Sequence, residues 1–253
     1  FLWKGSEMKT GYIKYTKSEQ LLERALMVTP LGSQTYSKSY RYFCKGCSPL
    51  FLKRGKGCYV WDVDGNKYID FICALGAVTI GYCNKEINKV LQKQLKKGIS
   101  FSQGTEFEIK LAEKLSKIIP GAEMSRFLKN GSDATSAAVR LARAFTGKEI
   151  IAVCGYHGMQ DWYIGSTCNS EGVPDCVKKL TVVFEYNNFE SLERIFKQYK
   201  GNVAAVILEP IQGRGPDKEY LERIRAITKE YGTLLIFDEV VSGFRYALGG
   251  ASE

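Results

Sequence analysis

From about residue 104 to the last residue given, apolar segments alternate with segments whose apolar residues recur at helical spacing. The expected strands cover 126–128, 149–154, 180–184, 203–208 and 233–238, and the expected helices cover 106–118, 133–145, 189–199 and 218–231. Strands that are apolar throughout are typical of parallel sheets with helices on both faces. The pattern therefore predicts an α/β fold with a mainly parallel sheet. In such sheets, ligands bind at the carboxyl ends of the strands.

The first part of the chain lacks this alternation. Residues 8–56 are irregular apart from one expected helix at 18–27, and they suggest an arm. Residues 58–71 form two short strand-like segments that meet at Asp64-Gly65, which predicts a β-hairpin. We therefore expect two regions, an N-terminal arm with a hairpin in 1–75 and an α/β domain in 76–253.

The charge balance alone leaves several kinds of partner open. The chain has 36 basic and 27 acidic residues and a net charge of +9, which would suit binding of nucleic acid, an acidic membrane or anionic metabolites. However, the five lysines within 85–97 lie between apolar residues at helical spacing, as on the solvated face of an amphipathic helix. No nucleic-acid-binding motif accompanies them. The apolar runs are also far shorter than the roughly 20 residues of a membrane helix.

We therefore expect neither nucleic acid nor a membrane as a partner. The first residues lack the layout of a secretory signal, so a cytoplasmic location is expected. Eight cysteines, several of them inside apolar runs, predict free and mostly buried thiols. Cys44 and Cys47 form one C-x-x-C pair, but a structural zinc site needs a second pair of ligands, and His157 is the only histidine. No metal site is expected.

A candidate anion site lies in Lys129-Asn-Gly-Ser-Asp-Ala134, which joins an expected strand to an Ala-rich helix. Gly131 allows close approach to the backbone, and Ser132 with the first-turn amides can bind a phosphate. An ordinary capped helix is the alternative, because Ser-Asp before a helix is common. A Walker loop and a dinucleotide fingerprint are both absent, which argues against a nucleotide.

Two carboxylates, Asp238 and Glu239, stand at the tip of an expected buried strand. Burying a carboxylate is costly unless a positive group meets it. A protonated pyridine nitrogen would meet Asp238, and pyridoxal phosphate (PLP) held in this way acts as an electron sink. The alternative is a structural carboxylate paired with Arg245 or another base.

An aromatic side chain follows another expected strand, in Tyr156-His157-Gly158. Tyr156 could stack on a planar cofactor, with His157 near the ring substituents. A tyrosine that simply packs in the core would explain the same residues equally well.

Together and in this order, these segments resemble the class III aminotransferases, in particular the glutamate-1-semialdehyde 2,1-aminomutase branch. The resemblance runs from about residue 18 to 253. Its most specific parts are the hairpin at 61–70, Asn130-Gly-Ser-Asp-Ala134 with Arg140-Leu-Ala-Arg143, Tyr156-His-Gly158, Glu209-Pro-Ile-Gln-Gly213, and Asp238-Glu-Val240 with Gly243-Phe-Arg245. It implies a truncated fold-type I PLP-dependent transferase. Residues 1–75 would belong to its small domain and 76–253 to an incomplete large PLP-binding domain.

The resemblance also implies a role for each candidate residue. Asp238 and Glu209 are the catalytic candidates, and Asp238 would meet the ring nitrogen. The other expected cofactor contacts are Gly131 and Ser132 at the phosphate, Tyr156 and Val240 on the two ring faces, and His157 near the ring. The anchor of a substrate carboxylate stays open between Lys38 and Arg41. Ala74-Leu-Gly76 stands where aminomutases have Ser-Trp-Gly, so the substrate also stays open.

The activity implied is transfer of an amino group on a small amino or keto compound, to a second molecule or within one, by a homodimer. In the family, a Schiff-base lysine lies some tens of residues beyond the position of Asp238, whereas no lysine follows Lys229 here. Amine transfer needs that lysine as imine partner and as base. We therefore expect a fragment that is inactive alone, cut from an active parent. A non-catalytic PLP-fold subunit is the alternative.

Overall fold

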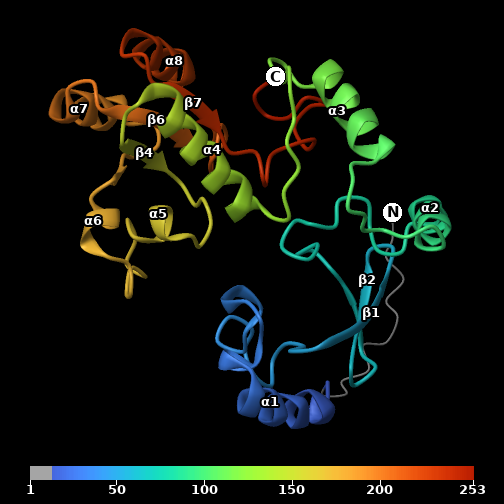
Figure 1. Cartoon of the computed structure of the whole chain (residues 1–253). Helices are drawn as coiled ribbons and strands as arrows, with labels where there is room; N and C mark the ends of the chain where they lie inside the picture. The colour runs from blue at the N-terminus through green and yellow to red at the C-terminus, as the bar shows by residue number, and fades with distance from the viewer. Residues whose placement is uncertain (1–12) are drawn as a thin grey trace, which may run out of the picture. The chain divides into compact units, whose positions relative to one another are not determined.

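The computed structural model describes residues 13–253. The chain divides into two compact units, with the boundary between Phe101 and Ser102, and its elements are labelled in Figure 1. The sequence analysis drew its boundary at 75/76, and the assignment of the two regions to a small and a large domain stays a prediction. Part of the expected arm, residues 1–12, lies outside the described residues.

The first unit is built on an antiparallel sheet with the strand order β1-β2-β3. The strands are β1 (Leu52–Lys56), β2 (Tyr59–Asp62) and β3 (Lys67–Ile69), and the helices are α1 (Thr16–Val28), α2 (Lys85–Leu95) and the single turns η1 (Pro30–Gly32) and η2 (Tyr36–Lys38). The predicted first helix and the predicted hairpin are therefore confirmed. The lysine-rich helix is confirmed as α2, but its apolar side chains, such as Val90 and Leu95, are also exposed.

Two aspartates explain why the hairpin and α1 form together. The buried Asp62 accepts hydrogen bonds from the backbone and side-chain amides of Asn66, both at 2.8 Å, and so closes the turn. Asp64 accepts from the backbone N–H groups of Lys17 (2.7 Å) and Ser18 (3.0 Å) at the start of α1. Burial alone would raise the pKa of Asp64, but these hydrogen bonds outweigh it and lower the pKa. The Asp62-x-Asp64 spacing thus serves a helix N-terminus and a turn.

The second unit contains a parallel sheet with the strand order β5-β4-β6-β7. Its strands are β4 (Ile150–Cys154), β5 (Thr181–Val183), β6 (Val203–Leu208) and β7 (Leu234–Phe237). Its helices are α3 (Glu106–Ile118), α4 (Gly131–Thr146), α5 (Asp161–Ile164), α6 (Asp175–Lys178), α7 (Phe189–Tyr199) and α8 (Tyr220–Glu230). The predicted parallel α/β architecture is confirmed, with the short helices α5 and α6 as unpredicted additions.

Helices cover both faces of this sheet, as Figure 1 shows for α4 on one side and α7 and α8 on the other. Alternate residues of the fully buried β4 point to opposite faces. Ala152 packs in the cluster that contains Leu192 of α7 and Ile224 of α8, whereas Ile151 packs in the cluster that contains Val139 of α4. Burial on both faces fixes the strand ends, and these ends carry the candidate site.

Two structural expectations were wrong. Residues 126–128 form no strand and pair with none of the described strands, and Phe127 and Leu128 are exposed. The eight cysteines are free, but only Cys154 is buried, because it alone lies in a strand of the parallel sheet. Burial raises the pKa of the Cys154 thiol to about 12.

Across residues 13–253, no helix combines the length and apolar character needed to cross a membrane. Within the same range, no three histidine, cysteine or acidic side chains are grouped so that they could hold a metal ion.

Candidate active site

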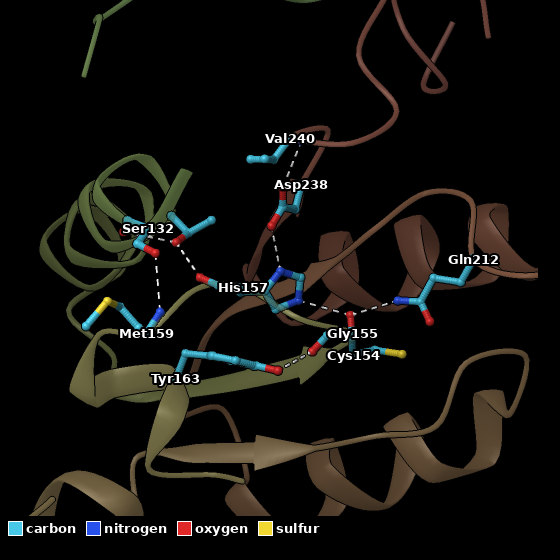
Figure 2. Close-up of polar contacts among 10 residues, drawn as sticks. Ser132, Cys154, Gly155, His157, Met159, Tyr163, Gln212, Asp238 and Val240 are labelled. Carbon is cyan, nitrogen blue, oxygen red and sulfur yellow. Dashed lines mark hydrogen bonds and ion pairs between the residues drawn. The ribbon is translucent and has the colours of Figure 1, made fainter. Parts of the chain in front are cut away.

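The candidate residues of the second unit gather at the carboxyl end of its sheet (Figure 2). Residues 155–159 follow β4, Glu209 and Gln212 follow β6, and Asp238 to Val240 follow β7. The N-terminus of α4, with Gly131 and Ser132, completes the group. This is the edge at which parallel α/β sheets bind ligands, because the loops there leave backbone groups and side chains available.

A buried pair, Asp238 and His157, lies at the centre of this edge. The side chains are 5% and 0% exposed, and His157 Nδ1 lies 2.7 Å from Asp238 Oδ2. The other ring nitrogen, Nε2, lies 3.0 Å from the carbonyl oxygen of Cys154. A carbonyl and an ionised carboxylate only accept hydrogen bonds, so each ring nitrogen needs a hydrogen to make both contacts. The geometry thus fits an imidazolium paired with a carboxylate.

Asp238 keeps acceptor capacity beyond this pair. Its Oδ1 accepts the backbone N–H of Val240 at 3.0 Å. Each carboxylate oxygen offers two acceptor positions, so a further N–H can be received from a ligand. The sequence left open whether Asp238 meets a ligand or pairs with a base of the protein. The structure shows that it pairs with a base, His157. The expected position of His157 near a cofactor ring stays a prediction.

Gly131 and Ser132 open α4 and lie against the other loops of the site. Asn130 caps the helix, because its Oδ1 accepts the N–H of Asp133 at 2.9 Å. The N–H groups of Gly131 and Ser132 precede the first intrahelical hydrogen bonds and therefore remain available, as is general for a first helical turn. Such amides, with the positive end of the helix dipole, are suited to a phosphate.

Glycines at two positions allow this close packing. A side chain on Gly131 would lie 2.9 Å from Val240 Cγ2, too close for carbon atoms. Gly158 has a φ of 109° and faces the Ser132 side chain, which an added Cβ would strike. Met159 donates its N–H to Ser132 Oγ at 3.2 Å, so the Ser132 hydroxyl hydrogen remains available to a ligand.

Tyr156 and Val240 present open apolar surface at the same edge. Their exposed fractions are 66% and 61%, so Tyr156 is not a packed core tyrosine. The ring of Tyr156 meets the ring of Tyr163 edge to face, with centroids 5.6 Å apart. Tyr163 is in turn fixed by its hydroxyl, which donates to the carbonyl of Gly155 at 2.8 Å. The expected stacking of Tyr156 and Val240 on a ring stays a prediction.

Glu209 lies next to the Gly155 backbone, at the same strand end as the Asp238–His157 pair. An added Cβ on Gly155 would lie 3.0 Å from Glu209 Oε1, which shows how closely the side chain approaches. Burial, together with the charge of Asp238, raises the pKa of Glu209 above its ordinary value. Gln212 approaches the same strand end, and its Nε2 donates to the carbonyl of Cys154 at 3.3 Å. Whether Glu209 takes part in catalysis stays a prediction.

Replacing Glu209 with glutamine is expected to remove the part of the pH dependence of folding stability that the ionisation of Glu209 causes. A carboxyl whose pKa is raised on folding binds more protons when folded, so ionising it above its ordinary pKa of 4.5 destabilises the fold. The unfolding free energy of the variant minus that of the wild type should therefore increase between pH 4 and pH 7. Urea unfolding at both pH values measures this difference. The exposed Glu222→Gln is the control, and an equal trend in it would contradict the interpretation.

Glu239 has a role that sequence reasoning missed. Its carboxylate accepts hydrogen bonds from Ser242 Oγ (2.8 Å), from the backbone of Ala251 (2.6 Å) and from both the backbone and hydroxyl of Ser252. Burial would raise the pKa of Glu239, but the Ser252 hydroxyl and the other donors lower it. Glu239 therefore stabilises, through these hydrogen bonds, the loop that follows β7. No local sequence pattern signals the contacts with Ala251 and Ser252, because these donors lie twelve and thirteen residues further along the chain.

The two candidate substrate anchors, Lys38 and Arg41, belong to the first unit. Their proposed contact with a substrate carboxylate stays a prediction.

The chain is similar to known proteins over almost its whole described length. Residues 43–251 match the family Aminotransferase class-III. Glutamate-1-semialdehyde 2,1-aminomutases from Aquifex aeolicus and Persephonella marina are each 40% identical to it, over 94% and 95% of the chain and 59% of their own length. The chain thus spans less than two thirds of the curated relatives that it matches.

Solved structures give the same picture. An omega-transaminase from Sphaerobacter thermophilus is 31% identical, with a TM-score of 0.83 over 93% of this chain and 58% of that one. A transaminase with PLP bound is 29% identical, with a TM-score of 0.86 over 94% of this chain and 58% of that one. Family match, sequence identity and fold agree: the chain belongs to the class III aminotransferase family.

Proposed function

We propose that this chain carries the PLP-binding part of an enzyme that moves an amino group on a small amino or keto compound. The observation that supports this most is the buried Asp238–His157 pair at the carboxyl end of the sheet. The Asp238 carboxylate is buried, held by His157, and still has free acceptor positions. Such a carboxylate suits a cationic ring nitrogen.

The remaining residues also fit PLP. The available amides of Gly131 and Ser132, with the Ser132 hydroxyl, can form a phosphate cradle. Side chains on Gly131 or Gly158 would strike Val240 or Ser132 and so disturb it. Tyr156 and Val240 offer apolar surface for the ring. When bound, PLP supplies an electron sink for the carbanion that an amino acid leaves on losing its α-proton. The part of Asp238 is to pair with the protonated ring nitrogen, and the part of His157 is to hold the Asp238 carboxylate in place.

The names of the relatives support an enzyme rather than a non-catalytic subunit. The curated relatives described above are aminomutases, and the structural ones are transaminases. Both classes move an amino group, within one molecule or between two, so both remain within the proposal. The expected homodimer and cytoplasmic location stay predictions, and sedimentation velocity would test the first.

Replacing Ser132 with alanine is expected to weaken PLP binding by about 10- to 100-fold. A hydrogen bond to a charged group contributes about 1.5–3 kcal/mol, which corresponds to this loss. The dissociation constant can be measured by titrating the apoprotein with PLP and following the cofactor absorbance. Ser116→Ala on the exposed face of α3 is the matched control and should bind as the wild type does. Equal affinities in all three proteins would contradict the proposed phosphate cradle.

A further inference from the structure

Cys44 and Cys47 stand at the two ends of a tight turn in the first unit. The N–H of Cys47 donates to the carbonyl oxygen of Cys44 at 3.2 Å, and Gly46 has a φ of 78°. A hydrogen bond across four residues with a left-handed glycine in third place is the pattern of a type II β-turn. Such a turn holds the first and last Cα atoms within about 7 Å of each other.

The Cys44 carbonyl oxygen also accepts hydrogen bonds from the next residue, Ser48, and these stabilise the turn further. Ser48 donates both its N–H and its hydroxyl to the Cys44 oxygen, each at 3.1 Å. Three donors therefore converge on one acceptor and hold the two cysteines near each other before any bond joins them. Disulfides need Cα separations of about 4.4–6.8 Å, a range that this turn reaches. Both cysteines are exposed, so a reagent in solution can approach either sulfur.

We propose that Cys44 and Cys47 form a reversible disulfide by exchange with a low-molecular-weight disulfide. The thiolate of one cysteine attacks the reagent, forms a mixed disulfide and releases one thiolate. The second cysteine then attacks the protein-side sulfur of that mixed disulfide and releases the other thiolate. The two cysteines are oxidised, the reagent disulfide is reduced to two thiols, and these take up the two cysteine protons.

The cross-link would close one end of a run of turns. Residues 36–38 form η2, the Ser39 carbonyl then accepts from Tyr42 (3.0 Å) and Phe43 (3.1 Å), and the Cys44 turn follows. Lys38 and Arg41 lie within this run. The disulfide rests only on the local geometry of residues 44–48, so it can form or fail to form whether or not the proposed PLP function holds.

Trypsin offers a direct test, because it cleaves after Arg41, Lys45 and Lys53 and so separates the two cysteines. The folded protein is equilibrated in oxidised and reduced glutathione, the remaining thiols are alkylated, and the digest is analysed by mass spectrometry. Fragments 42–45 and 46–53 should appear joined as one species that reduction splits. Because the turn is already ordered, the equilibrium constant for closure should be at least about tenfold larger than in urea-unfolded protein.

Matched variants separate this pair from the other exposed thiols. Cys44→Ser and Cys47→Ser should lose the joined fragment and retain glutathione on the remaining cysteine, whereas Cys58→Ser should behave as the wild type. Circular dichroism confirms that each variant is folded. The proposal is overturned if Cys44 and Cys47 carry separate glutathione adducts in the folded protein, if either joins Cys58 instead, or if closure is no more favourable than in urea.

Discussion

Replacing Asp238 with alanine in the PLP-loaded parent enzyme is expected to lower kcat by roughly 10²- to 10³-fold. Loss of one preorganised group that stabilises charge in a transition state raises the activation free energy by about 2.7–4 kcal/mol, and each 1.36 kcal/mol corresponds to a tenfold change in rate. The loss should fall on the chemical step, because the carboxylate would stabilise a charged ring nitrogen throughout the reaction. Steady-state kinetics at saturating PLP and substrate measure it.

Two further variants show whether the charge itself matters. Asp238→Asn keeps the size and an acceptor for His157 but removes the negative charge, so its kcat should stay close to that of the alanine variant. Asp217→Asn removes a half-exposed carboxylate that pairs with Arg214 on the surface, and it should change kcat less than twofold. An alanine variant that retains more than a tenth of the wild-type kcat with PLP bound would contradict the assigned role.

The regular elements were predictable because their signals are local. The helix at 106–118 was predicted from its apolar periodicity with the bounds that α3 has, and the structure adds a capping box of Thr105 and Glu108 at its start. The helix at 189–199 was equally clear, with Asn188 as its cap. The expected strand at 126–128 failed, because two apolar residues, Phe127 and Leu128, do not reveal whether a neighbouring strand exists to pair with them.

The site was predictable in its residues but not in their connections. Asp238 and His157 could each be placed after a buried strand, yet their pairing depends on the order β4-β6-β7, in which another strand lies between them. Two carboxyl ends of parallel strands converge at one edge, and that convergence was the available signal. The reach of Glu239 to Ala251 and Ser252 had no such signal, because it depends on the path of an irregular loop.

Replacing His157 with phenylalanine is expected to lower the unfolding free energy of the second unit by about 3–5 kcal/mol. Phenylalanine fills a similar volume, but it leaves the buried carboxylate of Asp238 without its His157 partner and removes one of the two side-chain donors to the Cys154 carbonyl. Amide hydrogen exchange in the fully buried β4 reports this stability directly. Tyr163→Phe is the matched control, because it removes one part-buried hydrogen bond to the nearby Gly155 carbonyl and should cost only about 1 kcal/mol.

The double variant His157→Phe with Asp238→Ala decides whether charge pairing is the cause. If the cost of each single change comes from the charge left behind, removing both partners should cost far less than the sum of the two single changes. A non-additivity of about 2–3 kcal/mol is therefore expected. Additive costs would mean that His157 stabilises the fold by packing alone. In that case the pairing with His157 would not stabilise the Asp238 carboxylate, and the N–H of Val240 would be left to orient it.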